Sequence, residues 1–302
     1  MRAFRLLGRS LAFVGLVTGP LAATLGQERP GGRLPAADDV QIATRWVDLT
    51  HPFDKTTIYW PTEDGFQLSV ENFGMTAKGY FYASNRFTSA EHGGTHLDAQ
   101  IHFAKGGKTV DQISLDRFIG KAAVIDVSDA CAQDADYEVS IEDLRAWEVK
   151  NRRQLVDVIV LIHTGFGSRW PDRKRYLGTD RLGPEAVAEL HFPGLSPDAA
   201  TWLTEHRAIK AIGIDTASID HGQSKRFQSH VTLFASNVPA FENVANVHLL
   251  PPFGATVIAL PMKIAGGTGG PLRVVASIPA TDDAVGSEGR AEEGIRRGGE
   301  TR

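Results

Sequence analysis

The chain has 302 residues, of which 42% are hydrophobic and 23% are charged, an ordinary globular composition. Its formal net charge of −4 and sequence pI of about 6.2 exclude the basic surface that nucleic-acid binding requires, so no nucleic-acid partner is expected. The single cysteine, Cys131, excludes an internal disulfide.

The two ends of the chain differ in composition from the middle. Arginines, a short apolar run and small residues follow one another over residues 1–26, which indicates a secretory signal peptide. The apolar run is shorter than the ~20 residues of a membrane span, so no span is expected once the signal is cleaved. Residues 27–42 are a predicted flexible lead-in. We predict a folded domain over 43–280, a disordered, mostly charged or small-residue tail over 281–302, and export, with the bacterial periplasm as the destination.

The predicted elements of the domain are mostly strands. Apolar runs rich in β-branched residues predict buried strands at 45–50, 122–127, 156–163, 209–214, 255–261 and 272–278. A capping box at 140–143 predicts a helix that continues through Trp147. Proline in the first turn predicts helices over 183–190 and 196–206. Because helices are fewer than strands and do not strictly alternate with them, we expect a single β-rich, layered α/β domain.

The most informative stretch is HGGTHLDAQIH, which runs from residue 92 to residue 102. His92, His96, Asp98 and His102 share one parity, so an extended strand would project all four to one face. A straight strand of that length spans roughly 33 Å, whereas the ligands of one metal each lie about 2 Å from it. The chain must therefore bend, and the two glycines after His92 supply the freedom for that bend.

Two other interpretations of this stretch are less favoured. A helix with two histidines on one face is disfavoured by the two glycines, and the zinc-protease motif needs glutamate where Gly93 stands. A surface strand that carries histidines by chance is disfavoured because three of only ten histidines fall within eleven residues, with no histidine-rich tract.

Several residues outside the stretch have two open interpretations. Asp215 and Asp220 follow a predicted strand, where they either orient ligands from behind or form Asx turns. Tyr80, Phe81 and Tyr82 precede the stretch, where they either add to an aromatic wall or pack on an incoming strand.

The stretch resembles the H-x-G-T-H-x-D-x-P-x-H motif of the cyclase-like metal-dependent hydrolases, a family that includes bacterial kynurenine formamidase and isatin hydrolase. Segments 48–53 with 59–61, 213–220, 261–264 and 266–273 are similar to the opening, central and closing segments of that family. The resemblance implies a swivelling β/β/α domain, assembled as a homodimer or homotetramer.

The resemblance also implies a set of metal ligands. His92, His96 and Asp98 match the first metal site of the formamidase branch. A second metal there uses the shared aspartate, a later histidine and a glutamate twelve residues beyond it, and His230 and Glu242 stand at that spacing. Imidazole and carboxylate ligands suit Zn²⁺ or Mn²⁺, so we expect one or two such ions per subunit.

Three further residues match or depart from the motif near the substrate. His102 matches the proton donor and acceptor, and Trp60 matches a tryptophan that contacts substrate. The family's proline is Gln100 in this chain, which leaves the backbone before His102 freer. Its amide is predicted to reach substrate or metal.

The predicted activity is hydrolysis of the C–N amide bond of a small aromatic or cyclic amide by metal-activated water. The candidate substrates are isatin-like and N-formylkynurenine-like, and export slightly favours the isatin-like class because tryptophan breakdown is normally cytoplasmic. One alternative is a metal-dependent cyclase or dehydratase of secondary metabolism. Another is a non-catalytic periplasmic metal-binding homologue, which would have no need for the imidazole of His102.

Overall fold

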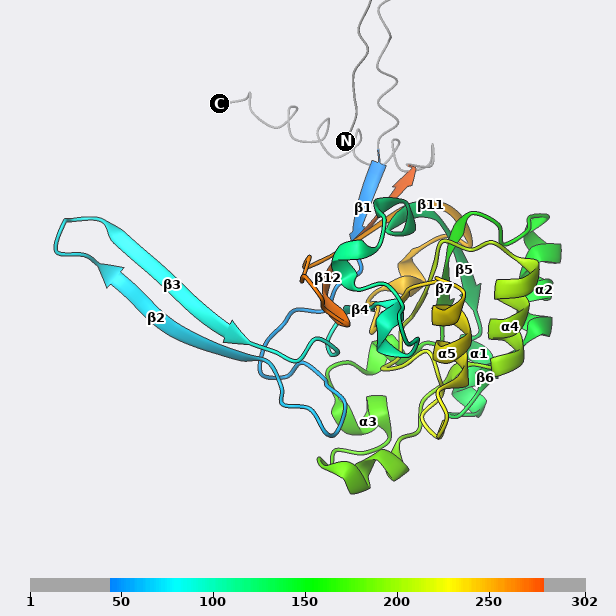
Figure 1. Ribbon diagram of the computed structural model, residues 1–302, viewed down its shortest axis with the longest axis horizontal. Helices are drawn as coiled ribbons and strands as arrows, with labels where there is room; N and C mark the ends of the chain where they lie inside the picture. Colours follow the sequence, from blue (N-terminus) through cyan, green and yellow to red (C-terminus); the bar gives the residue numbers. More distant parts are fainter. Residues whose placement is uncertain (1–43, 280–302) are drawn as a thin grey trace, which may run out of the picture. The chain divides into compact units, whose positions relative to one another are not determined.

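The computed structural model describes residues 44–279 (Figure 1). The predicted signal peptide, lead-in and tail lie outside the described residues. Among the described helices, none combines the length and apolar character needed to cross a membrane.

The central sheet has eight strands in the order β1-β12-β11-β5-β7-β9-β10-β4, and a further pairing of β4 with β12 closes it into a barrel-like sheet. Strands β5, β7, β9 and β10 are parallel, and the other pairings are antiparallel. The bounds are β1 Thr44–Asp48, β4 His96–Asp98, β5 Ile119–Asp126, β7 Val158–His163, β9 Ala211–Ile214, β10 Ala240–Glu242, β11 Phe253–Pro261 and β12 Gly269–Pro279. Two short strands, β6 (Glu138–Val139) and β8 (Gly194–Leu195), pair with each other.

Alternate residues of the central strands face two separate apolar cores. In β7, Val160 and Ile162 pack with residues of the helices α2 (Ile141–Asn151), α4 (Pro197–His206) and α5 (Gln228–Ala235). Ile159 and Leu161 face the other core, inside the barrel-like sheet. Figure 1 shows these helices along one side of β5 and β7. Burial of both faces explains why the central strands are continuous apolar runs in the sequence.

The predicted fold class is confirmed, and all six predicted strands form, with ends that differ by a few residues. The capping box is present at Ser140 and Asp143, and Ser196 caps α4 through the Ala199 amide. The helix predicted over 183–190 forms at Pro184–Glu189, with proline in its first turn, but as a 3-10 helix. Only Ala186 of that segment is buried, so it lacks the apolar stripe that stabilises an α-helix in a protein.

A long hairpin is the main element that sequence patterns do not predict. It consists of β2 (Gln67–Met75) and β3 (Phe81–Thr88), with most of its residues exposed (Figure 1). Tyr80, Phe81 and Tyr82 lie on it with exposed side chains, so they neither pack in a core nor line the cavity described below. Two short helices, α1 (Ser128–Gln133) and α3 (Arg173–Leu177), are also unpredicted, as is α5.

Candidate active site

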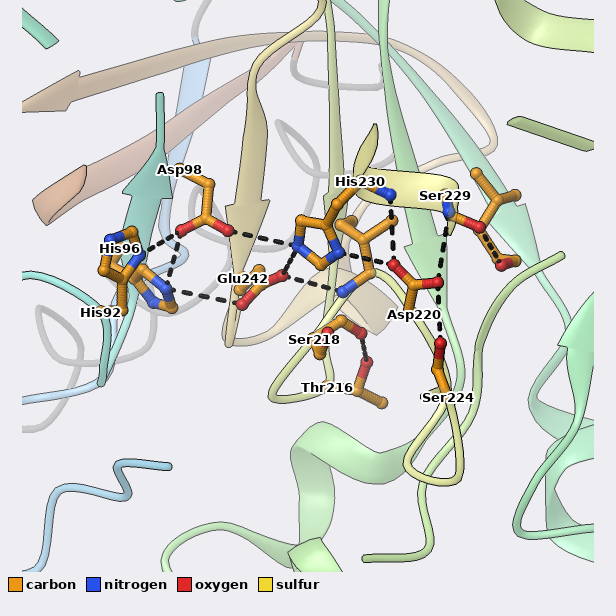
Figure 2. A network of polar contacts seen from close by, with 12 residues as sticks. His92, His96, Asp98, Thr216, Ser218, Asp220, Ser224, Ser229, His230 and Glu242 are labelled. Atoms are coloured by element: carbon orange, nitrogen blue, oxygen red, sulfur yellow. Dashed lines mark hydrogen bonds and ion pairs between the residues drawn. The ribbon is translucent and has the colours of Figure 1, made fainter. Parts of the chain in front are cut away.

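The five predicted metal ligands meet at one place, although they come from separate segments. His96 and Asp98 are the first and last residues of β4, and His92 precedes that strand. Glu242 ends β10 and is paired directly with His96 across the antiparallel ladder. His230 lies in the first turns of α5. Figure 2 shows their side chains in one continuous chain of polar contacts.

The bend predicted after His92 is confirmed. Gly94 has φ 57°, in the left-handed region that favours glycine, and its amide donates to the Ile58 carbonyl at 3.0 Å. At Gly93 a side chain has no room, because an added Cβ would lie 2.0 Å from Cδ1 of Tyr59. The two glycines therefore turn the chain and let the motif lie against Tyr59.

The first ligand group consists of His92, His96 and Asp98. Oδ1 of Asp98 lies 2.7 Å from Nδ1 of His92 and 3.1 Å from Nε2 of His96. Nδ1 of His96 donates to the Gly94 carbonyl at 2.9 Å, so in the neutral ring Nε2 carries the lone pair. That buried Nε2 has no hydrogen-bond partner among the described residues and faces carboxylate oxygens. Either a proton or a metal ion between these electron-rich groups would relieve their contact, so the geometry fits a metal.

The second ligand group consists of Asp98, His230 and Glu242. Nε2 of His230 lies 2.9 Å from Oε1 of Glu242 and 3.3 Å from Oδ2 of Asp98. Asp98 therefore presents one oxygen to each ligand group. Nδ1 of His230 is 2.6 Å from Oδ2 of Asp220, which orients the ring.

The titratable groups of the cluster shift one another strongly. Burial, and then the charge of Asp98, raise the pKa of Glu242. Burial alone would lower the pKa of His230, but hydrogen bonds to Asp220, Asp98 and Glu242 raise it well above its usual value. Burial opposes ionisation of Asp98, yet the charge of His92 and the hydrogen bonds of three histidines hold its pKa well below its usual value. Positive charge therefore stabilises the buried carboxylates of this cluster, and a divalent ion would supply it.

A cavity of about 460 Å³ opens onto both ligand groups. Its wall is aromatic: the Phe227 ring centroid lies 6.3 Å from that of Trp60 and 5.2 Å from that of Phe103. His102 lines the cavity and stacks on His92, with centroids 3.8 Å apart. Desolvation lowers the pKa of His102 to about 4, so at neutral pH its ring is uncharged.

The other predicted site residues fall in different places. Trp60 lines the cavity, whereas Gln100 is not among the lining residues and is 1% exposed, with neither amide atom hydrogen-bonded among the described residues. Asp220 contacts the ring of His230, which agrees with the interpretation that it orients a metal ligand from behind. Asp215 instead accepts hydrogen bonds from Thr164 and does not reach the ligands.

Phe227 is a cavity residue that sequence patterns miss. It precedes α5 and has φ 48°, with no motif around it. A second aromatic residue of the wall, Phe103, directly follows His102, and this position next to the motif is the sequence feature that could have placed it at the cavity.

The fold and the donor set define an α/β domain with a candidate metal site that opens onto a cavity of about 460 Å³. A model of the Cyclase family, described as "Putative cyclase", matches residues 47–221, and the chain belongs to that family. Its relatives include isatin hydrolase of Roseibium aggregatum, 33% identical over 210 residues, which are 67% of this chain and 77% of that protein. Kynurenine formamidase of Bacillus mycoides is 28% identical over 236 residues, 77% of this chain and 97% of that protein.

Solved structures are similar as well. Isatin hydrolase A from Labrenzia aggregata, bound to benzyl benzoate, has a TM-score of 0.70 and 32% identity, covering 78% of this chain and 94% of that one. An isatin hydrolase bound to the product analogue thioisatinate also has a TM-score of 0.70, with 29% identity over 78% of this chain and 93% of that one.

Proposed function

We propose that the chain is a metal-dependent hydrolase that opens the C–N amide bond of a small aromatic or cyclic amide. The observation that carries the proposal is the pair of buried ligand groups that share Asp98 at an aromatic cavity which also contains His102. The relatives named isatin hydrolase and kynurenine formamidase support an amide as the substrate class.

The ligand groups would hold one or two Zn²⁺ or Mn²⁺ ions, because imidazole suits zinc and carboxylate-rich sites also accept manganese. When bound, a divalent ion in such a site makes a nucleophilic water available at neutral pH and polarises an amide carbonyl.

His102 is the proton carrier in this proposal. It lies in the cavity beside the first ligand group and is neutral at pH 7, so it accepts a proton from the attacking water and delivers it to the leaving nitrogen. Trp60, with Phe103 and Phe227, presents flat apolar faces on which an aromatic ring stacks. Of the two candidate substrates we favour the isatin-like class.

The test measures metal content and amide opening on the same purified protein. Isatin and N-formylkynurenine hydrolysis are assayed for the wild type, for His102→Ala, and for His206→Ala as an exposed control. Loss of roughly 10²- to 10⁴-fold in rate is expected for His102→Ala, with metal content unchanged. Absence of bound divalent metal in the wild type would refute the proposal. Opening of neither amide would reopen the substrate class, and a product without an added water would favour a cyclase or dehydratase.

We also propose that the chain forms a homodimer or homotetramer. Eight exposed large apolar side chains lie on the hairpin or its turn: Leu68, Val70, Phe73, Met75, Tyr80, Phe81, Tyr82 and Phe87. A lone two-stranded hairpin is only marginally stable in water. A second copy of the chain that covers the hairpin would bury these side chains and stabilise it. In sedimentation velocity, the double variant Phe73→Ser and Phe81→Ser should shift the wild-type oligomer toward monomer, and an unchanged distribution would argue against this interface.

Export to the periplasm remains a proposal from residues 1–26. Cell fractionation, with N-terminal sequencing of the mature protein, tests it directly. A cytoplasmic protein with an intact Met1 would contradict it.

A further inference from the structure

The loop that leads into β12 contacts His92 on the side away from the ligand cluster. Nδ1 of His92 faces Asp98, while Nε2 lies 2.9 Å from Oγ1 of Thr268. That hydroxyl is 2.5 Å from Oε2 of Glu91, and the Thr268 backbone amide donates to the same oxygen at 2.9 Å. The three side chains therefore form a relay from His92 through Thr268 to Glu91.

The direction of the relay follows from its donors and acceptors. A hydroxyl has a single proton, and an ionised carboxylate only accepts, so Thr268 donates its proton to Glu91. Thr268 must then accept from His92, which places the His92 proton on Nε2. In the neutral ring the lone pair of Nδ1 is then left facing Asp98 and His96, where the first ion would bind.

The loop itself is firmly held. The Thr268 carbonyl accepts from the Ala99 amide at 2.8 Å, and the Gly267 carbonyl accepts from the Val110 amide at 3.0 Å. The next residue, Gly269, pairs with Asp98 across β4 and β12. A Cβ on Gly269 would lie 2.5 Å from Cε1 of His92, so the ring packs directly on this backbone. The acceptor for Nε2 is thus placed by the same strand pairing that places Asp98.

We propose that Glu91 and Thr268 are positioning residues for the first metal site, which set the tautomer and the orientation of His92. The inference rests on the proposed function only in taking His92 as a metal ligand. It differs from the arrangement at the second site, where His230 contacts the carboxylate of Asp220 directly. Outer partners of this kind are worth about 10- to 100-fold in metal affinity.

The test measures Zn²⁺ affinity by competition with a chromophoric chelator, starting from metal-free protein. Thr268→Val removes the hydroxyl at constant shape and should weaken Zn²⁺ binding by about 10- to 100-fold. Thr268→Ser keeps the hydroxyl and should restore tight binding, and Glu91→Gln should weaken it in the same direction as Thr268→Val. Thr256→Val is the matched control, because among residues 44–279 the Thr256 hydroxyl on β11 accepts only from Lys121.

The melting temperature of the metal-free proteins separates positioning from folding, since positioning predicts similar values for Thr268→Val and Thr268→Ser. Wild-type affinity in Thr268→Val, or failure of Thr268→Ser to restore binding, would overturn the inference. Because the readout is metal binding, a chain that opens neither amide but shows this pattern would reopen the substrate class of the proposed function and leave the inference standing.

Discussion

Asp220 has two roles at once. Its Oδ2 contacts Nδ1 of His230 at 2.6 Å, and its two oxygens accept the Ser229 and His230 amides at the start of α5. The carboxylate therefore caps the helix and orients the ligand that the helix carries. This explains why a helix with no capping side chain at Phe227 still begins there.

Asp220→Asn should weaken Zn²⁺ binding at the second group by about 10- to 100-fold, because the amide is a poorer acceptor for the imidazole N–H. Helix capping should be largely kept, since asparagine also caps helices well. Chelator competition measures the affinity. Ser224→Ala is the control: it removes a 3.2 Å contact to the other Asp220 oxygen and the 3.2 Å hydrogen bond that Ser224 accepts from the Phe227 amide, but it leaves the contact between Asp220 and His230, so it should bind as the wild type does. Equal affinities for all three proteins would exclude the orienting role.

His51 predicts a pH dependence of stability. Its ring stacks on Trp170 with centroids 4.2 Å apart, and burial lowers its pKa to about 4. In the unfolded chain the pKa is about 6.5, so between pH 6.5 and 4 the unfolded state binds a proton that the folded state does not. The free energy of unfolding should therefore fall as the pH drops through that window and be unaffected by this group above it.

His51→Phe keeps a flat ring on Trp170 and has no proton to bind. In urea unfolding at a series of pH values, the wild type should lose more stability than the variant between pH 6.5 and 4. Parallel pH profiles for the two proteins would show that His51 is not responsible for any acid sensitivity.

At the scale of elements, the bend before β4 depends on Gly93. An added Cβ would meet the Tyr59 ring, whose hydroxyl is held by Ser89 at 2.7 Å. Gly93→Ala should lower the free energy of unfolding by about 1–3 kcal/mol through overpacking, and it should weaken Zn²⁺ binding because His92 is displaced. Gly65→Ala is the matched control, since nothing lies within 4 Å of its added Cβ. Urea unfolding and chelator competition check both effects, and identical values for the two variants would contradict the steric argument.

Sequence patterns predict the buried elements better than the exposed ones. Strand β7 and residues 122–125 of β5 are buried on both faces and stand out as continuous apolar runs. The hairpin of β2 and β3 faces no core, and the alternation of Leu68 with Val70 and of Phe73 with Met75 is interrupted by the bulge between Val70 and Asn72, so only a weak strand pattern marks it. Strands β4 and β10 have three residues each, and their pairing is decided by the sheet rather than by local preference.

For the whole molecule, metal should act as a stabiliser. Asp98 and Glu242 are buried together, and the charge of Asp98 raises the pKa of Glu242, which is the mark of two carboxylates in need of a cation. A ligand that binds only the folded state at 100 times its dissociation constant adds about 2.7 kcal/mol. Removal of metal with a chelator should therefore lower the melting temperature, and Zn²⁺ or Mn²⁺ should restore it. The variant His96→Ala should respond far less, and a wild type with the same melting temperature in both states would contradict the prediction.

The sequence by itself determined the class of the fold and the side chains that could ligate a metal. His92, His96, Asp98 and His102 lie within eleven residues, so their spacing and the two glycines after the first histidine were sufficient to predict a bent metal-binding segment. The tertiary structure decided what lies at a distance along the chain. It placed Glu242 opposite His96 by strand pairing, brought Phe227 and Trp60 into one wall, and put Thr268 behind His92. The reason is physical: local spacing limits only which neighbouring side chains can share a face, whereas contacts between distant segments depend on sheet closure and on the packing of two cores.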